Sequence, residues 1–241
     1  MLDRTRNAKP LYLQIKEIVK QKIVNNEYTL GTTIPSENEL EEIFGVSRMT
    51  IRQAISELVN EGLLRKERGR GKGTIVLSNV IADRLTTIKS FTQKMQEQGF
   101  VLENKDMATE FLPAGEHIGS VFGLEPQEQI FCLKRTRMVN NDIIMYSVSF
   151  VPLSLNLPTD VTSYDSLYKQ FAKENITIHH AEEFIEATLA DERISEKLEV
   201  PLGAAVLKRT RTSQDTTGRY VEYTETYYRS DKYKYVVELT M

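Results

Sequence analysis

The most distinctive chemistry in the chain lies in a five-residue sequence that occurs twice. Leu-Lys-Arg-Thr-Arg spans residues 133–137 and recurs without change at residues 207–211. Each copy lies in a strand-like run, so its two arginines point to the same face of the strand. Paired guanidinium groups suit an anion such as a phosphate. The motif alone does not decide which copy binds, and a solvated strand face is the alternative interpretation of Arg135 and Arg137.

A second set of polar side chains lies in the first third of the chain. Residues 48–60 have apolar residues at helical spacing, and the opposite face presents Met49, Arg52, Gln53 and Ser56. Side chains of arginine and glutamine suit phosphate oxygens and base edges. Basic residues are also concentrated between positions 65 and 72, where Glu67 alone opposes them. This pattern favours a polyanion as partner, although a charge run is also typical of a solvated surface.

Length, composition and charge limit the classes of protein. The chain has 241 residues, of which 40% are apolar and 27% charged, as in a folded globular protein of one or two domains. With no apolar stretch of membrane-spanning length, no apolar signal region and one cysteine, Cys132, we expect a cytoplasmic protein without disulfides or membrane association. Residues 1–77 hold 13 Lys/Arg against 10 Asp/Glu, a net charge of +3, whereas residues 78–241 hold 18 against 24, a net charge of −6.

Three predicted helices and a hairpin position the basic residues of the first third. An amphipathic helix follows Pro10, and Ser36 with Glu39 matches the capping box of a second helix that ends at Gly45. Ser47 is a suitable N-cap for the third helix, residues 48–60. Residues 63–77 form two short predicted strands with a glycine-rich basic tip. This order predicts a winged helix-turn-helix, with a small helical bundle and a flexible loop as the alternative.

These residues resemble the DNA-binding domain of the GntR family of bacterial transcription regulators. The resemblance runs from Leu11 to Val76 and is carried by residues 34–40 (IPSENEL), 44–54 (FGVSRMTIRQA) and 61–64 (EGLL). It implies that the second helix start, the third helix and the wing contact double-stranded DNA through Ser36, Ser47, Arg48, Thr50, Arg52, Gln53, Arg68, Gly69, Arg70, Gly71 and Lys72. The sequence departs from the family at Asn38, where many relatives carry an arginine, and in its longer wing tip.

The remaining two thirds alternate strands and short helices. Strands are predicted at residues 106–111, 129–139, 144–150, 184–189, 204–213 and 220–229, and helices at 90–99, 166–175 and 191–198. Each Leu-Lys-Arg-Thr-Arg copy precedes a polar turn and a second strand, so each belongs to a hairpin. We predict an α+β fold with one mixed sheet and helices packed on it. The expected domains are residues 1–77 and 89–241, joined by a linker at 78–88.

This layout resembles the effector-sensing UTRA domain of the HutC subfamily of GntR regulators, from about Thr86 to the end of the chain. Residues 166–168 (SLY) and 228–233 (YRSDKY) match its landmarks. The resemblance implies an effector site in which Arg135 and Arg137 bind a phosphate. It also implies contributions from Ser90, Phe91, Ser147, Ser166, Tyr168, Glu222 and Tyr228. Ser147 stands where relatives usually have glutamate, so the resemblance does not identify the sugar.

We therefore predict a homodimeric DNA-binding transcription regulator, most simply a repressor of a carbohydrate operon, that responds to a small anionic effector such as a sugar phosphate. An organic acid such as urocanate or a fatty acid is an alternative effector, and activation is an alternative mode. A lyase-like enzyme is a third hypothesis, because the UTRA fold is shared with chorismate lyase. No catalytic grouping, cofactor or metal site is expected. His179 and His180 lack further ligands at metal-binding spacing.

Overall fold

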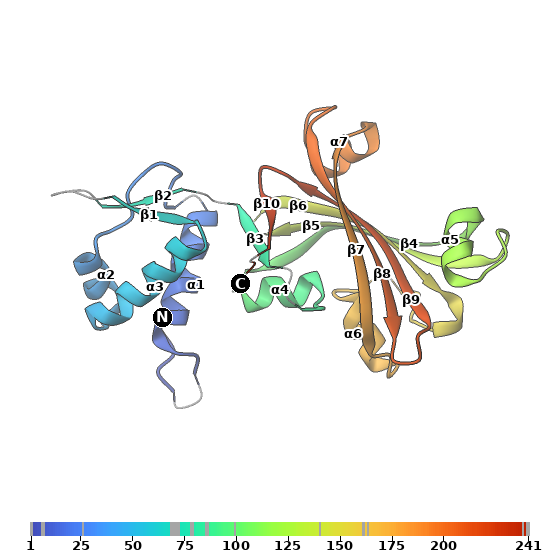
Figure 1. Cartoon of the computed structure of the whole chain (residues 1–241), viewed down its shortest axis with the longest axis horizontal. Helices are drawn as coiled ribbons and strands as arrows, with labels where there is room; N and C mark the ends of the chain where they lie inside the picture. The colour runs from blue at the N-terminus through green and yellow to red at the C-terminus, as the bar shows by residue number, and fades with distance from the viewer. Residues whose placement is uncertain are drawn as a thin grey trace. The chain divides into compact units, whose positions relative to one another are not determined.

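The computed structural model describes residues 2–5, 8–25, 27–67, 73–77, 80–84, 87–98, 100–139, 141–160, 162, 164–237 and 239. The chain divides into two compact units (Figure 1). The first unit comprises Met1–Arg84 with Glu97–Phe100 and Lys234–Met241, and the second comprises Leu85–Gln96 and Val101–Tyr233. Each unit is described by itself. No helix in the described part of the chain is long and apolar enough to span a membrane.

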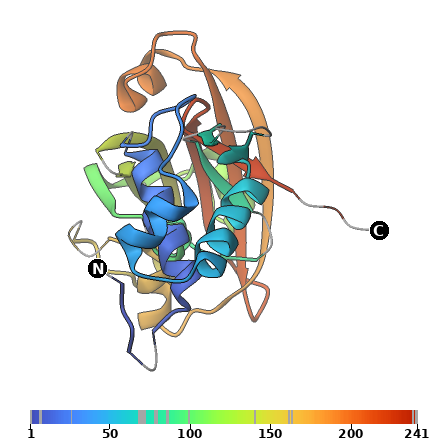
Figure 2. The same ribbon diagram turned by 90° about the vertical axis from the view of Figure 1, so that its left-hand side faces the viewer.

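The first unit has three helices and a two-stranded sheet, as the sequence predicts (Figure 2). Its elements are α1 (Leu11–Val24), α2 (Glu37–Phe44), α3 (Arg48–Asn60), β1 (Leu64–Lys66) and β2 (Thr74–Val76). The apolar faces of the helices meet in one core that includes Ile15, Leu40, Ile55 and Leu58. The strands β1 and β2 pair in antiparallel fashion. This is a winged helix-turn-helix, and the helical-bundle alternative is wrong.

Local signals fix the helix-turn-helix. The Ser36 hydroxyl accepts from the Glu39 amide while the Glu39 carboxylate accepts from the Ser36 amide, which is a complete capping box. Gly45 ends α2 with φ of +60°, a left-handed conformation that glycine adopts without strain. Two residues later, Ser47 caps α3. The short turn therefore fixes where α3 begins.

The second unit is built on a six-stranded sheet with the order β4-β5-β6-β9-β8-β7. Its strands are β4 (Leu102–Pro113), β5 (Gln129–Val139), β6 (Asp142–Pro152), β7 (Ile178–Leu189), β8 (Ala205–Asp215) and β9 (Tyr220–Arg229). Every neighbouring pair is antiparallel, so the prediction of a mixed sheet is wrong, although the α+β class is confirmed. Strands that follow one another in the chain are neighbours in the sheet, except β6 and β7, whose connection crosses to the far edge. Neither kind of connection produces a parallel pair here.

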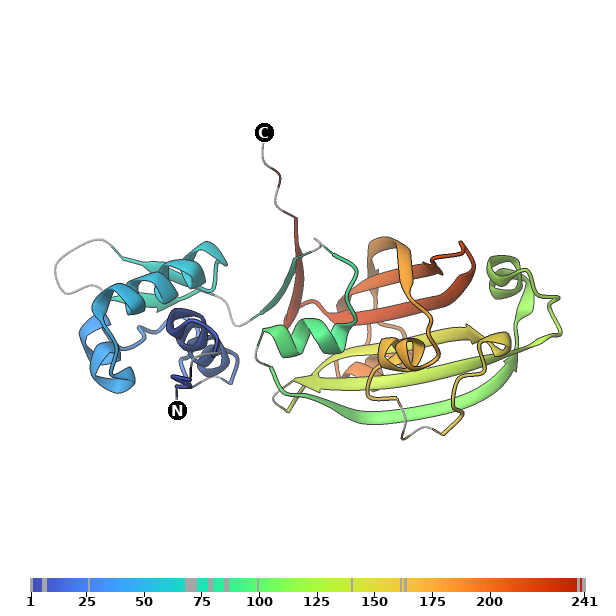
Figure 3. The same cartoon turned by 90° about the horizontal axis from the view of Figure 1, so that it is seen from below.

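Helices cover both faces of this sheet. The elements are α4 (Phe91–Glu97), α5 (Gly115–Phe122), a 3-10 helix η1 (Leu153–Leu155), α6 (Leu167–Lys173) and α7 (Glu192–Leu198). Helices α4 and α6 lie in front of the sheet in Figure 3. Leu167 and Phe171 of α6 pack with Leu133, whereas Ile194 and Leu198 of α7 pack with Cys132, the residue before Leu133 on β5. Consecutive strand residues point to opposite faces, so α6 and α7 lie on opposite faces.

Part of the predicted linker is a strand. Residues Ile81–Arg84 form β3, which pairs with β10 (Tyr233–Val236) in a separate two-stranded sheet. The pairing joins segments about 150 positions apart in the chain. The two hairpins that contain the repeated sequence lie side by side, because β6 pairs with β9. This adjacency places all four repeat arginines in one central region of the sheet.

Candidate functional site

In the first unit, the exposed face of α3 carries the predicted cations. The side chains of Arg48 and Arg52 are 60% and 56% exposed. Ser47 caps the helix by accepting from the Thr50 amide, and the Ser47 and Thr50 hydroxyls lie 3.0 Å apart. Cationic side chains at the start of a helix that directly follows a tight turn can reach DNA phosphates and base edges.

Glu37 organises the cations on this surface, which sequence reasoning missed. Its carboxylate lies 3.4 Å from Arg48 Nε, 3.6 Å from Arg52 Nε and 2.9 Å from Lys66 Nζ. Partial burial opposes the charge, but the Lys66 hydrogen bond and the two arginines lower the pKa of Glu37. One carboxylate thus gathers two residues of α3 and one of β1. Glu37 shares the first turn of α2 with Glu39, and an acidic first turn is a common helix signal that gives no indication of this role.

The predicted DNA-contacting residues fall into three groups. Ser36, Ser47, Arg48, Arg52 and Gln53 are exposed, and Thr50 is half-buried at the start of α3. Asn38, the departure from the family pattern, is also exposed on α2. The predicted wing-tip contacts lie outside the described residues: Arg68, Gly69, Arg70, Gly71 and Lys72.

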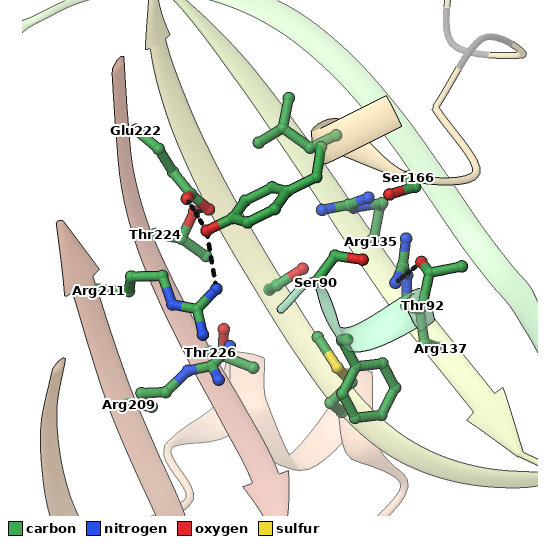
Figure 4. Close-up of a pocket in the computed structure, with 15 residues that line it drawn as sticks. Ser90, Thr92, Arg135, Arg137, Ser166, Arg209, Arg211, Glu222, Thr224 and Thr226 are labelled. Atoms are coloured by element: carbon green, nitrogen blue, oxygen red, sulfur yellow. Dashed lines mark hydrogen bonds between the residues drawn. The ribbon is translucent and has the colours of Figure 1, made fainter. Parts of the chain in front are cut away.

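In the second unit, a polar cavity lies between the sheet and the helices α4 and α6 (Figure 4). Its volume of about 40 Å³ is below the roughly 300–1,000 Å³ of typical ligand sites. An effector of sugar size therefore requires the lining side chains to move apart. The lining residues are Ser90, Phe91, Thr92, Arg135, Arg137, Met145, Ser147, Ser166, Leu167, Tyr168, Arg209, Arg211, Glu222, Thr224 and Thr226.

The first arginine pair is buried and donates to neutral oxygens. Arg135 and Arg137 are 7% and 2% exposed, so the interpretation as a solvated strand face is wrong. Arg137 donates to the Asp165 carbonyl at 2.7 Å, to Thr92 Oγ1 at 3.0 Å and to Asn104 Oδ1 at 3.2 Å. Arg135 donates to the Tyr164 carbonyl at 3.4 Å, and its Nε has no partner among the described residues. Neither forms an ion pair within the described part of the chain.

Burial sets the electrostatics of this pair. Loss of solvent lowers the pKa of Arg135 to about 10, so the guanidinium stays charged at neutral pH. Burial and the positive charge of Arg135 lower the pKa of Arg137 as well. The negative charge of Glu222 partly opposes the shift at Arg135, but neither arginine forms an ion pair among the described residues, so the pair favours an anion.

The second arginine pair holds a carboxylate. Arg211 forms a short ion pair with Glu183 on β7, and Arg209 Nη1 lies 3.6 Å from the same carboxylate. Arg211 also donates to the Tyr168 hydroxyl at 2.9 Å. In Figure 4 the two pairs lie on opposite sides of the cavity. The structure therefore brings both copies of the repeated sequence to one site.

A network of hydroxyls surrounds Glu222 at one end of the cavity. Its carboxylate accepts from Ser213 Oγ at 2.8 Å, Thr224 Oγ1 at 2.7 Å and the Tyr168 hydroxyl at 3.1 Å. Burial and the Glu222 charge raise the pKa of Tyr168 to about 12, so its hydroxyl remains a hydrogen-bond donor at neutral pH. Ser147 and Thr226 also line the cavity, and their hydroxyls have no partner in the part of the chain that is described.

Eight of the nine predicted effector residues line the cavity, and Tyr228 does not. Tyr228 is fully buried and stacks on Tyr233, with ring centroids 4.2 Å apart. Its ring also packs beside Phe91 and the Arg209 guanidinium, so it contacts residues that line the cavity without lining it itself. Sequence reasoning missed Thr92, Met145, Leu167, Thr224 and Thr226 as lining residues. The signal for Thr224 and Thr226 was present, because they share a strand face with Glu222.

The described residues contain no cluster of metal-ligating side chains. Cys132 is buried, and burial raises the pKa of its thiol to about 11, so it is not a reactive nucleophile at neutral pH. The winged helix-turn-helix with exposed cations and the separate sheet domain with a cationic cavity are the parts of a DNA-binding transcription regulator.

Comparison with known proteins identifies the family. Residues 11–76 match the bacterial regulatory proteins of the gntR family, and residues 97–234 match the UTRA domain. The chain is 32% identical over 229 residues to the HTH-type transcriptional repressor NagR of Bacillus subtilis, covering 94% of this chain and 93% of NagR. The protein belongs to the GntR family, in the group whose members carry a UTRA domain, and it is a transcription regulator and not an enzyme.

Two further matches extend this result. The Mannosyl-D-glycerate transport/metabolism system repressor MngR of Escherichia coli is 26% identical over 231 residues, which covers 95% of each chain. The crystal structure of PhnF from Mycobacterium smegmatis shares the fold, with a TM-score of 0.68 and 23% identity over 95% of this chain and 99% of that chain.

Proposed function

We propose that the protein is a homodimeric repressor of a carbohydrate uptake or catabolic operon, and that a sugar phosphate releases it from its operator. The relatives NagR and MngR are named as repressors, and the name of MngR refers to the transport and metabolism of mannosyl-D-glycerate. In this proposal residues 1–77 bind DNA, and residues 89–241 bind the effector and dimerise, with residues 78–88 as the linker.

One observation carries the choice of effector. Arg135 and Arg137 are buried side by side in the cavity, and their hydrogen-bond partners among the described residues are carbonyl, amide and hydroxyl oxygens. A phosphate dianion would supply the direct ion-pair partner that neither guanidinium group has among the described residues. Ser90 and Phe91, at the start of α4, line the same part of the cavity. Ser166, the N-cap of α6, and Tyr168 on α6 line the cavity and would contact the sugar.

Homodimerisation follows from the DNA-binding unit. A single winged helix-turn-helix contacts one half-site, whereas two copies related by a two-fold axis contact a palindromic operator. The effector shifts the balance between operator-bound and released states through its different affinity for the two. The proposed mechanism requires no cofactor.

The experiment is a thermal-shift panel of phosphorylated hexoses and hexosamines, their unphosphorylated parents, and carboxylates that include urocanate. A ligand at about 100 times its Kd stabilises the protein by roughly 2.7 kcal/mol, which corresponds to several degrees in Tm. We expect a shift with a sugar phosphate and none with its parent sugar. A shift with carboxylates alone would replace the sugar phosphate by an organic acid.

The matched variant is Arg135→Gln, with Lys208→Gln as control. Lys208 lies on the strand of the second pair and forms an ion pair with Glu225 at 2.8 Å outside the cavity lining. We expect Arg135→Gln to abolish the effector-induced shift and the release of DNA while operator binding persists. Its Tm without ligand should fall little, because the substitution removes an uncompensated buried charge. A normal effector response in Arg135→Gln would place the site elsewhere.

A further inference from the structure

The floor of the cavity has an approximate two-fold symmetry that follows from strand register. Arg135 on β5 lies opposite Ser147 on β6, Ser147 lies opposite Thr226 on β9, and Thr226 lies opposite Arg209 on β8. These four residues form one row across four strands, which we call the central row. It reads arginine, serine, threonine, arginine. Both ends of the row are therefore cationic, and both middle positions carry hydroxyls.

The symmetry extends to the second arginine of each pair. Arg137 lies opposite Met145, and Arg211 lies opposite Thr224. A rotation by 180° about an axis that passes between Ser147 and Thr226, perpendicular to the sheet, exchanges Arg135 with Arg209 and Arg137 with Arg211. It thus superposes the two copies of Leu-Lys-Arg-Thr-Arg. Each end of the cavity presents the same arrangement of two guanidinium groups on alternate strand positions.

The middle of the central row lacks hydrogen-bond partners. Ser147 and Thr226 are 1% and 0% exposed, and neither hydroxyl is satisfied by the residues that the structure describes. Buried polar groups are normally hydrogen-bonded. Two unsatisfied hydroxyls between two cationic ends indicate that a polar ligand spans the row.

The second arginine pair already holds an anion that belongs to the chain itself. The Glu183 carboxylate contacts Arg211 and lies 3.6 Å from Arg209, while both guanidinium groups line the cavity and Glu183 does not. Burial opposes ionisation of Glu183, but Arg209, Arg211 and Lys94 lower its pKa, so it remains a carboxylate. Glu183 therefore approaches from the β7 side. Glu222 lines the cavity and is linked to Arg211 only through the Tyr168 hydroxyl, so the direct donor positions on the cavity side of the pair are left to a ligand.

We propose that the effector is a phosphorylated sugar with a second acidic group, a carboxylate or a second phosphate. The phosphate binds Arg135 and Arg137, the second acidic group binds Arg209 and Arg211, and the polar middle of the ligand bonds the hydroxyls of Ser147 and Thr226. This inference rests on the proposed function, because it assigns the first pair to phosphate. It adds a second anion subsite at the opposite end of the cavity.

Calorimetric titration of the full-length protein with matched ligands tests the second subsite. Sorbitol 6-phosphate and 6-phosphogluconate differ at C1, which is a hydroxymethyl group in one and a carboxylate in the other. Fructose 6-phosphate and fructose 1,6-bisphosphate differ by a second phosphate. We expect at least a tenfold tighter Kd for the doubly acidic member of one pair. Tighter binding of 6-phosphogluconate than of sorbitol 6-phosphate would identify the second acidic group as a carboxylate. Tighter binding of fructose 1,6-bisphosphate than of fructose 6-phosphate would identify it as a phosphate.

The possible failures are distinguishable. Binding of the singly phosphorylated sugars with no gain from a second acidic group would overturn the second subsite and leave the proposed function intact. A panel in which no phosphorylated sugar binds would overturn both. Equal binding of gluconate and 6-phosphogluconate would show that the phosphate adds no affinity, and would refute the assignment of a phosphate to Arg135 and Arg137.

Two variants separate a ligand subsite from a structural ion-pair network. Arg209→Gln should remove the preference for the doubly acidic ligand, whereas Lys208→Gln should retain it. Thr226→Val removes an unsatisfied hydroxyl at nearly constant volume, so we expect an unchanged or higher Tm together with weaker ligand binding. If Arg209→Gln lowers only the Tm and the preference persists, or if Thr226→Val binds ligand normally, the subsite is refuted.

Discussion

At the scale of single residues, the two sites use arginine in opposite surroundings. Arg48 and Arg52 are exposed; the Nε atoms of both lie near Glu37, and that of Arg48 also lies 4.0 Å from Glu41. Arg135 and Arg137 are buried, and burial lowers the pKa of both. Exposed arginines exchange water and counter-ions for DNA phosphates at modest cost. Buried arginines favour an anion because water no longer solvates their charge.

The exposed arginines carry the first prediction at this scale. Arg48→Ala and Arg52→Ala should each weaken operator binding by roughly tenfold or more, since one good contact to a base or phosphate contributes about 1–3 kcal/mol. Fluorescence anisotropy with labelled operator DNA measures the change. Arg193→Ala, an exposed arginine on α7, is the control and should bind as the wild type does. Unchanged affinity in both α3 variants would refute the assignment of α3 as the recognition helix.

At the scale of elements, the sequence predicts what local signals determine. The capping box at Ser36, the left-handed turn at Gly45 and the N-cap at Ser47 are all present in the structure. The identical repeats also predict two hairpins correctly. The strand order is not a local property, because the pairing of β6 with β9 joins residues about 80 positions apart. The antiparallel sheet and the meeting of both arginine pairs therefore could not be derived from either repeat alone.

The lengths of the two edge strands, β4 and β7, are also not predicted fully from the sequence. β4 begins at Leu102 and β7 at Ile178, several residues before the predicted starts at 106 and 184. Their additional residues are largely polar and exposed, as is common where one side of a strand lacks a neighbour. An apolar alternation is the signal for a half-buried strand. Polar edge segments therefore give too weak a pattern to predict.

The turn between α2 and α3 gives an element-scale prediction. Gly45→Ala should destabilise the first unit by about 1–2 kcal/mol, because φ of +60° is strained for alanine. Crowding is a minor factor, since an added Cβ would meet only Arg4 Nη2 at 3.5 Å. Urea unfolding measures the loss. Gly45→Asn should lose less, because asparagine tolerates this conformation better. Equal stability of Gly45→Ala and wild type would contradict the argument.

The β8–β9 turn gives a pH prediction. Asp215 accepts from the Thr217 hydroxyl at 2.6 Å and from the Thr217 and Arg219 amides, and these bonds lower its pKa to about 2. The unfolded value is about 3.9. A lowered pKa contributes stability that is present above about pH 4 and is lost as the pH falls toward 2.

Asp215→Asn should therefore be less stable than the wild type at pH 7, and the difference should shrink below pH 4. Thermal unfolding between pH 2 and pH 7 measures it. Glu42→Gln, a change at an exposed position on α2, is the control and should follow the wild-type curve. A constant difference between Asp215→Asn and wild type across this range would exclude the proposed titration.

At the scale of the whole molecule, regulation requires coupling between the DNA-binding and effector-binding units. Coupling is reciprocal, so an effector that weakens operator binding by some factor must itself bind the operator complex more weakly by the same factor. The small volume of the cavity is relevant here, because in the proposed function binding of an effector rearranges its lining. The Tyr168 hydroxyl accepts from Arg211 and donates to Glu222 at one end of the cavity, so movement of Tyr168 would break both bonds.

The homodimer provides the prediction at this scale. Light scattering on the free protein should give twice the chain mass of 27.7 kDa. A palindromic site selected from random DNA should lose most of its affinity when one half-site is scrambled, because the second winged helix then gains only non-specific contacts. A monomer that binds the half-site as tightly as the palindrome would contradict the dimeric proposal.

The symmetry of the cavity floor also bears on the direction in which a ligand binds. A receptor with two equivalent ends offers an elongated ligand two head-to-tail orientations of nearly equal energy. In this protein the degeneracy is broken by groups outside the repeat: Glu183 lies behind one arginine pair, whereas Asn104 and the Asp165 carbonyl lie beside the other. Glu183 repels a doubly charged group more than a singly charged one. The duplication thus creates two cationic ends, and two acidic side chains outside the repeat, Glu183 and Glu222, distinguish the end with Arg209 and Arg211 from the other.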